Sequence, residues 1–227
     1  STNDGTIDFY LRVRTLINKK KIVLDLGASD AGWFNNKKNI RIRKKTQYLK
    51  NDVKFFYSAD IESSVLKNKT SHKNLIIINN KIPLKKNSVD IIISDWTFEH
   101  VENVKVFYKE INRVLKKGGT LCARTPHKYN YFAILNSFLE GRPSKEKLLL
   151  KSQPRRKSDD YWKSFYRLNT LYKIKKIFNN FKSNSFIFVP DPSYYFGSKY
   201  LFYIFKLIHL IAPKFFSGIL ILFLQKK

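Results

Sequence analysis

Five short apolar runs alternate with stretches of helical pattern over residues 1–125, and this order is the strongest constraint on the fold. Each run is of the kind found in strands that are buried on both faces. Between two of them, residues 103–115 carry apolar side chains at helical spacing and end before two glycines, as a helix does. Buried strands separated by helices favour a parallel sheet with helices on both faces. The expected strands are 21–27, 53–60, 74–79, 89–95 and 119–125.

The last third of the chain departs from this alternation. A polar stretch, 140–160, contains Pro143 and Pro154, so we expect an insertion over about 140–165. A helix is expected over 169–181, capped by Asn169 or Thr170, and two final strands over 185–190 and 218–224. An apolar helical element over about 194–213 separates these strands, and the whole chain, 1–227, is expected to be one domain. The apolar face expected for the 169–181 helix consists of Leu171, Ile174, Phe178 and Phe181.

The apolar tail is too interrupted for a transmembrane helix. A spanning helix needs about 20 predominantly apolar residues. Lysines and a proline divide the tail into shorter runs at Lys199, Lys206, Pro213 and Lys214. A helix buried in the core, followed by a strand, is the first expectation. The alternative is a helix at a membrane surface whose lysines reach anionic headgroups.

The formal net charge of +27 is far from that of an ordinary globular protein. Such a charge attracts nucleic acid, anionic lipid or acidic substrates. The alternative is that the lysines only form a solvated surface in a basic protein.

The single cysteine, Cys122, excludes an internal disulfide and an all-cysteine zinc site, and it lies in an apparent buried strand. No signal peptide is evident, so we expect a cytoplasmic protein.

The stretch VLDLGASDAGWF, residues 23–34, joins the first strand to a helix through small residues. Gly27, Ser29 and Gly32 fit the dinucleotide-binding pattern G-x-G-x-x-G, with serine at the second glycine. A pyrophosphate needs positive potential at the helix N-terminus, whereas Asp30 brings a carboxylate there. A ligand with an ammonium and a sulfonium group, such as S-adenosylmethionine, suits the site better. An acidic residue at the strand end, Asp25, would orient its amino-acid part.

Polar residues also end the next two strands. Asp60 follows the second strand, where its carboxylate would accept both ribose hydroxyls of the cofactor; the alternative is a cap on the following helix. Asn79 and Asn80 follow the third strand and would read the adenine edge, unless they are plain turn residues. All of these positions lie at the carboxyl ends of strands, where open α/β sheets bind ligands.

These stretches, with "ADIE" and the long run from Pro83 to Gly119, resemble the class I S-adenosylmethionine-dependent methyltransferases of the type 11 group. The resemblance extends over about residues 20–127. It implies a Rossmann-like sheet of seven mostly parallel strands, with helices on both faces and an antiparallel last strand. Ser29 and Ala31 stand where many members of the group have glycine. The cofactor-binding residues that the resemblance implies are Asp25, Gly27, Ala28, Ser29, Gly32, Asp60, Ile61, Asn79, Asn80, Asp95 and Trp96.

Two histidines are candidates for catalysis. Methyl transfer is an in-line displacement in which alignment supplies much of the acceleration, and a base is needed only when the acceptor must lose a proton. His100, in FEHV, matches the histidine of the family signature, and His127 follows the fifth strand on the acceptor side. Either is a candidate general base, and the alternative for each is a positioning role. The acceptor-pocket candidates are Tyr129, Tyr131, Tyr166 and Arg167, which packing would also explain.

The acceptor is expected to be a small molecule, a glycan or a lipid-linked compound, methylated on oxygen. An RNA methyltransferase is the main alternative, because a phosphate backbone would suit the charge. A membrane-surface binding module with a non-catalytic cofactor fold is another. Peripheral association with an anionic membrane is possible under the first reading, and the oligomeric state is left open. No metal-ligand spacing, P-loop or Ser/His/Asp set is present, so neither a metal-dependent nor a hydrolytic mechanism is expected.

Overall fold

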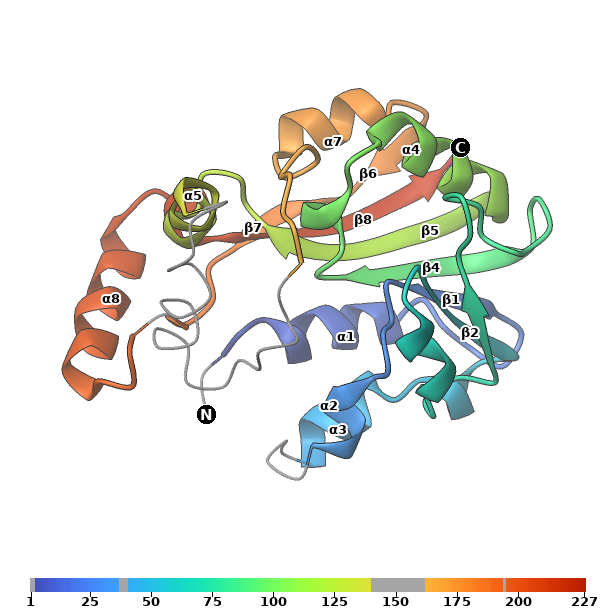
Figure 1. Cartoon of the computed structure of the whole chain (residues 1–227), viewed down its shortest axis with the longest axis horizontal. Helices are drawn as coiled ribbons and strands as arrows, with labels where there is room; N and C mark the ends of the chain where they lie inside the picture. The colour runs from blue at the N-terminus through green and yellow to red at the C-terminus, as the bar shows by residue number, and fades with distance from the viewer. Residues whose placement is uncertain (1–2, 37–40, 140–161, 194) are drawn as a thin grey trace.

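The computed structural model describes residues 3–36, 41–139, 162–193 and 195–227, and a twisted β-sheet forms its centre (Figure 1). The strands lie in the order β3-β2-β1-β4-β5-β8-β6, with β7 also paired to β8. The pairs from β3 to β5 are parallel, and β8 is antiparallel to its neighbours. The α/β fold with an antiparallel last strand is therefore confirmed. The strand bounds are β1 Ile22–Leu26, β2 Phe55–Asp60, β3 Lys73–Ile76, β4 Val89–Asp95, β5 Leu115–Pro126, β6 Phe181–Ser183, β7 Phe186–Phe188 and β8 Ile219–Lys226.

The two short strands β6 and β7 together occupy one position in the sheet. Ser183 pairs with Leu224 and Phe186 with Ile221, so the register along β8 continues without a shift. Between them, the Asn184 N–H donates to the Phe223 carbonyl at 2.8 Å. The sheet thus has the seven strand positions that the family resemblance implies.

Helices cover both faces of the sheet (Figure 1). On one face, α1 packs Phe9 and Val13 onto the sheet. On the other face, α4 buries Ile111 and Val114 at the spacing expected from the sequence. The helix bounds are α1 Thr6–Arg14, α2 Gly32–Asn35, α3 Arg41–Gln47, α4 Val104–Val114, α5 Tyr131–Phe138, α7 Leu171–Ile177, α8 Lys199–Ile211 and α9 Lys214–Ser217; a short 3-10 helix, Phe98–His100, follows β4.

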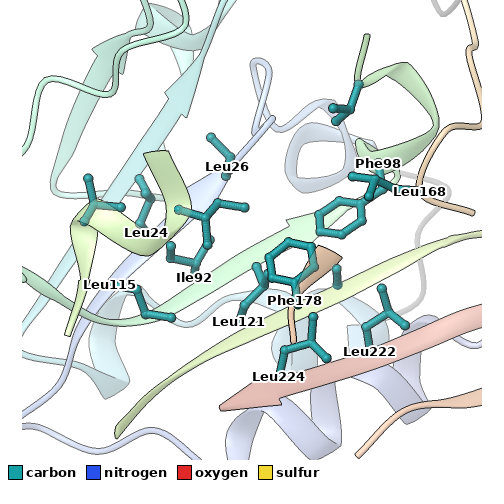
Figure 2. Packing of buried hydrophobic residues seen from close by; sticks show 14 of the residues in the cluster. Leu24, Leu26, Ile92, Phe98, Leu115, Leu121, Leu168, Phe178, Leu222 and Leu224 are labelled. Atoms are coloured by element: carbon teal, nitrogen blue, oxygen red, sulfur yellow. The ribbon is translucent and has the colours of Figure 1, made fainter. Parts of the chain in front are cut away.

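Aromatic rings pack together in the core, and Figure 2 shows Phe98 and Phe178 among its buried side chains. Phe98 and Phe178 stack at 6.4 Å between ring centroids, and Phe107 meets Phe98 edge-on at 5.2 Å. Thr170 caps α7 by accepting a hydrogen bond from the Lys173 N–H. The helix stops at Ile177, so placing Phe181 on it was wrong: Phe181 begins β6, although its ring packs against Phe178 in the same core.

Two further expectations need correction. Strand β5 begins at Leu115, directly after α4, because Leu115 pairs with Val89 before a register shift accommodates the glycines. The tail does form a helix, α8, but it is not buried, since Leu210 and Ile211 are 81% and 74% exposed. Within the described ranges, the helices are too short or too polar to cross a membrane. The expected insertion falls mostly on residues 140–161, outside the described part of the chain.

Candidate cofactor and active site

Four charged residues form a row across the carboxyl ends of four neighbouring strands. Asp25 pairs in register with Ser58, two residues before Asp60, and with Ile93, two residues before Asp95. Because side chains alternate between faces along a strand, the three carboxylates project from the same face. Asp95 pairs directly with Arg124 of β5, which completes the row. The register of the parallel sheet therefore brings together three aspartates that the sequence placed separately.

Asp25, at the centre of this row, has no hydrogen-bond or ion-pair partner for its carboxylate among the described residues. Burial, together with the nearby charges of Asp95 and Asp60, raises its pKa to about 8. A buried acid without a compensating cation resists ionisation. The site thus presents an acceptor group to which a bound cation would be attracted.

Asp95 is neutralised by Arg124. The guanidinium donates from Nε to Oδ1 at 2.7 Å and from Nη2 to Oδ2 at 2.8 Å. Arg124 also donates to Thr6 Oγ1 at 2.8 Å and lies 5.2 Å from the ring centroid of Trp96. Arg124 was not predicted as a site residue; its one signal in the sequence is an arginine inside the apolar run of β5. Arg124 holds Asp95 and Trp96 in place. The contact of these two residues with a cofactor stays a prediction.

Two polar residues that were not predicted as site residues lie beside the same carboxylates. Tyr10 of α1 is buried, and the pKa of its hydroxyl is raised well above the usual value by burial and by Asp95 and Asp25. Its side chain hydrogen-bonds to Gln47 of α3, which is also buried. The spacing of the apolar residues in α1 favours a packing role for Tyr10. Only the fold reveals that this face of α1 lies at the carboxyl ends of the strands.

The turn after β1 has the backbone of a glycine-rich loop, although it contains only two glycines. Gly27 has φ +79°, and its N–H donates to the Ala59 carbonyl at 2.8 Å. Ser29 and Ala31 are left-handed at φ 45° and 54°, the conformation that glycine adopts without strain. The Ala28 N–H also reaches the Ala59 carbonyl, at 3.3 Å. Ser29 and Ala31, the two departures from the family pattern, therefore adopt a backbone conformation that glycine favours.

Asp60 holds this turn in place. Its Oδ2 accepts from the Ser29 N–H at 2.9 Å, and its Oδ1 accepts from the Glu62 N–H at 3.1 Å. The 3-10 helix that follows β2 has Glu62 as its N-cap, so Asp60 is not that cap. Ile61 is 62% exposed beside the turn. Both residues remain predicted to contact the cofactor.

Asp30 has a local role that bears on the choice of ligand. Its Oδ1 accepts from the Gly32 N–H at 2.9 Å, at the beginning of α2. The backbone donor that a pyrophosphate would use is thus occupied by a carboxylate.

Asn79 and Asn80 form a tight turn. Both are left-handed, at φ 52° and 58°, and the Lys81 N–H donates to the Ile78 carbonyl at 2.9 Å. This is the pair of conformations expected in a type I′ turn, where asparagine is favoured. Asn80 also lines an open depression of about 650 Å³, together with Glu102, Asn103, Val104, Lys105 and Arg167. The adenine-binding role of both asparagines stays a prediction.

His100 is oriented by a backbone carbonyl. Its Nδ1 lies 2.9 Å from the Lys163 carbonyl, which can only accept, so Nδ1 carries the proton. In the neutral ring, Nε2 is then the basic nitrogen. The neighbouring Glu99 is buried, and burial raises its pKa, while His100 and a hydrogen bond from Thr125 lower it. This geometry is compatible with His100 as a general base.

A buried network beneath His100 was not expected from the sequence. Thr125 Oγ1 donates to Glu99 Oε2 at 2.7 Å, and Asn169 Nδ2 donates to Thr125 Oγ1 at 2.7 Å. The Glu99 carbonyl accepts from the N–H groups of Phe165 and Tyr166. Residues 162–170 are thereby fixed across the end of β5.

His127 is arranged for positioning. Its Nδ1 accepts from the Tyr129 N–H at 3.2 Å, and the ring also hydrogen-bonds to the Phe215 backbone. Burial lowers its pKa. Through these two interactions the ring stabilises the turn after β5. This favours a positioning role for His127 over that of a general base.

The four acceptor-pocket candidates make different contacts. Tyr131 stacks on Phe205 at 5.7 Å and joins α5 to α8. Tyr166 is buried and accepts from Asn136 at 3.1 Å. Arg167 instead donates to the Glu102 carbonyl at 2.7 Å and faces the Asn80 depression. Tyr129 is half exposed on the turn after β5.

Residues 43–123 match the methyltransferase domain family, a region that includes β2 to β4, α4 and most of β5. No curated protein sequence matches the chain significantly.

Several solved structures share the whole fold. YcgJ from Bacillus subtilis is 15% identical, with a TM-score of 0.58, and the match covers 98% of each chain. An S-adenosylmethionine-dependent methyltransferase from Aquifex aeolicus is 13% identical, with a TM-score of 0.52 over 99% of this chain and 94% of that one. Geranyl diphosphate C-methyltransferase from Streptomyces coelicolor is 11% identical, with a TM-score of 0.57 over 98% and 80%. At these identities the likeness extends to the fold alone.

The close approach of Thr97 to Gly27 gives a stability prediction. A Cβ at Gly27 would contact the Thr97 side chain, with Cγ2 at 2.8 Å, whereas one at Gly118 would meet nothing within 4 Å. Both glycines have positive φ, so Gly118→Ala isolates the backbone strain, of about 1 kcal/mol. We expect Gly27→Ala to lower the free energy of unfolding by about 1–3 kcal/mol more, measured by urea denaturation. Equal losses in the two variants would contradict the packing described here.

Proposed function

We propose that this chain, which has the class I methyltransferase fold and a methyltransferase domain over residues 43–123, transfers a methyl group from S-adenosylmethionine to an acceptor. The observation that carries the proposal is the row of Asp60, Asp25 and Asp95 beside an open glycine-type turn. Although the chain has a net charge of +27, it places three carboxylates together at this site. The central one, Asp25, has no hydrogen-bond or ion-pair partner among the described residues. That arrangement suits a ligand that is cationic where it meets Asp25.

The residues present fit this cofactor better than a dinucleotide. Asp30 occupies the Gly32 N–H, which removes a donor for a pyrophosphate. Gly27 lets Thr97 pack directly against the turn, because the Thr97 side chain fills the space that a Cβ would take. Asp60 would exchange its bond to the Ser29 N–H for bonds to the ribose hydroxyls. Asp25 would hold the amino-acid end.

When bound, the cofactor supplies an electrophilic methyl group on a sulfonium that is already a good leaving group. The protein then has to align an acceptor nucleophile and exclude water. We infer an acceptor hydroxyl, because His100 has Nδ1 committed to the Lys163 carbonyl and Nε2 available to take the hydroxyl proton. Glu99, buried next to it, would stabilise the imidazolium that forms.

The acceptor classes we propose are a small molecule, a glycan or a lipid-linked compound. The acceptor side is bounded by the turn after β5 and by residues 162–170, where aromatic side chains such as Tyr129 and Trp162 are partly exposed. Partly exposed aromatic residues suit a sugar or an apolar chain. RNA remains the alternative acceptor, and cofactor binding without turnover would instead support a binding module.

The first test is calorimetry of the full chain with S-adenosylhomocysteine and with NAD. We expect a measurable heat of binding for the first ligand and none for the second, because only the first lacks a pyrophosphate and carries an ammonium group. Binding of NAD alone would overturn the proposal.

A second prediction concerns Asp60. Asp60→Ala would leave ribose hydroxyls unpaired at a cost of about 1–3 kcal/mol, so the affinity should fall about ten- to hundredfold. Asp52→Ala, which removes a carboxylate paired with Arg14 away from the site, should leave the affinity unchanged. An unchanged affinity in Asp60→Ala, with the melting temperature preserved, would restrict Asp60 to holding the turn.

The raised pKa of Asp25 predicts a pH dependence. Between the ordinary aspartate pKa and about 8, the folded state keeps a proton that the unfolded chain has lost. The folded state then binds more protons, so the stability of the ligand-free protein falls as the pH rises through this window. Asp25→Asn should remove this fall, making the variant more stable than the wild type at pH 8 in urea denaturation. In the wild type, affinity for S-adenosylmethionine should rise over the same window, because the bound cation favours the carboxylate.

The asparagine variant should bind S-adenosylmethionine more weakly at the upper end of this window and without the pH dependence. A parallel pH profile in the two proteins would contradict the assignment of Asp25.

A further inference from the structure

Helix α8 presents an apolar face that no described element covers. Its exposed large side chains recur every three or four residues, so they form one stripe. We call this stripe the α8 outer face; it consists of Tyr200, Tyr203, Ile204, Leu207, Leu210 and Ile211. Tyr200 is 85% and Leu210 81% exposed, values that are unusual for residues of this kind gathered on one helix.

The opposite side of α8 is firmly held by the protein. Phe205 stacks on Tyr131 of α5, with the ring planes 9° apart. His209 is buried and its Nδ1 hydrogen-bonds to the Pro190 carbonyl at 2.8 Å. The outer face is therefore a fixed surface of the folded molecule. Figure 1 shows α8 beside α5 at one end of the molecule, beyond the carboxyl end of β5.

Basic residues border the outer face. Lys199 and Lys206 lie along one edge and line a depression of about 430 Å³ with Tyr195, Phe202 and Tyr203. Lys214 follows the helix and is exposed. One carboxylate, Asp191, also lines the depression, 3.6 Å from Lys206, and it is the only acidic residue in the sequence from 161 to 227. The edge of the face thus carries a net positive charge.

We propose that the α8 outer face docks on the surface of an anionic lipid bilayer. The apolar stripe would enter the boundary between headgroups and acyl chains, and Lys199, Lys206 and Lys214 would meet the lipid phosphates. A 13-residue helix is about 20 Å long, which suits a helix lying in the interface and is too short to span. Two copies of this chain, each with a net charge of +27, would repel one another when these lysine edges meet.

Helix α8 is also connected, through α5, to the turn that bounds the proposed acceptor side. Tyr131 begins α5, and α5 follows the end of β5 after the turn that His127 stabilises. A docked α8 therefore holds the turn after β5 near the bilayer. The docking proposal does not depend on the cofactor, because none of its residues belongs to the proposed cofactor site.

The test is co-sedimentation of the full chain with vesicles of equimolar phosphatidylcholine and phosphatidylglycerol, against vesicles of phosphatidylcholine alone. We expect binding to the anionic vesicles that weakens with added salt. Leu210→Gln should weaken it about tenfold, and Lys199→Gln with Lys206→Gln about twentyfold. The matched controls lie on α7: Tyr172→Gln replaces a side chain that is 72% exposed, and Lys175→Gln with Lys176→Gln removes two exposed lysines.

Wild-type binding in the α7 controls, together with weakened binding in the α8 variants, would support the proposal. Equal weakening in the α7 and α8 lysine variants would overturn it, because attraction would then come from the net charge alone. Absence of binding, or a dimer in sedimentation equilibrium that Leu210→Gln dissociates, would also overturn it. Calorimetry with S-adenosylhomocysteine on the same variants measures cofactor binding separately. A failure of membrane docking can therefore be distinguished from a failure of the proposed function.

Discussion

The placement of three partly buried carboxylates close together is the constraint on which the site depends. Placing like charges close together at the ends of adjacent strands, partly out of water, carries an electrostatic cost. The fold offsets this cost unequally. Asp95 has a bidentate arginine, Asp60 accepts two backbone N–H groups, and Asp25 has neither. Asp25, the carboxylate without such a partner, lies in the middle of the row, so a cation bound there would neutralise its charge.

Arg124 connects this row to the beginning of the chain. Its Nη1 donates to Thr6 Oγ1, which also accepts from Arg43 Nη2 at 2.9 Å. Arg43 in turn pairs with Asp4 at 2.7 Å. These bonds fix α1 and α3 over the carboxyl ends of the strands, and they bring Tyr10 and Gln47 next to Asp25 and Asp95. The N-terminal segment is therefore part of the site wall.

Much of the fold and part of the site could be predicted from the sequence. The ends of β1, β2 and β4 could be predicted because each apolar run stops at an aspartate or a glycine, and chain order alone puts Asp25, Asp60 and Asp95 at one edge. The pairing of Asp95 with Arg124 could not, because it depends on the β4–β5 register, which a shift near Val89 alters. The exposure of α8 could not either, since an apolar run does not reveal whether another element covers it. Phe181 was misplaced because it is buried in the same core as Phe178, the C-cap of α7.

The residues with a strained backbone lie in the turns next to the charged row. Ser29, Ala31 and Trp96 are all left-handed, and all lie just beyond the ends of β1 and β4. Left-handed residues other than glycine cost about 1–3 kcal/mol each and persist where the surroundings impose them. Here the Ser29 N–H is held by Asp60, and the Trp96 N–H donates to the Arg124 carbonyl at 2.8 Å. The charged row thus also fixes the turns around it.

The most direct measurement of this account is a crystal structure of the full chain with S-adenosylhomocysteine. The account predicts the ligand across the carboxyl ends of β1 and β2, with both ribose hydroxyls on the Asp60 carboxylate and the amino-acid end beside Asp25. A ligand bound elsewhere, or an Asp60 carboxylate that keeps the Ser29 N–H and makes no contact with the ribose, would contradict it.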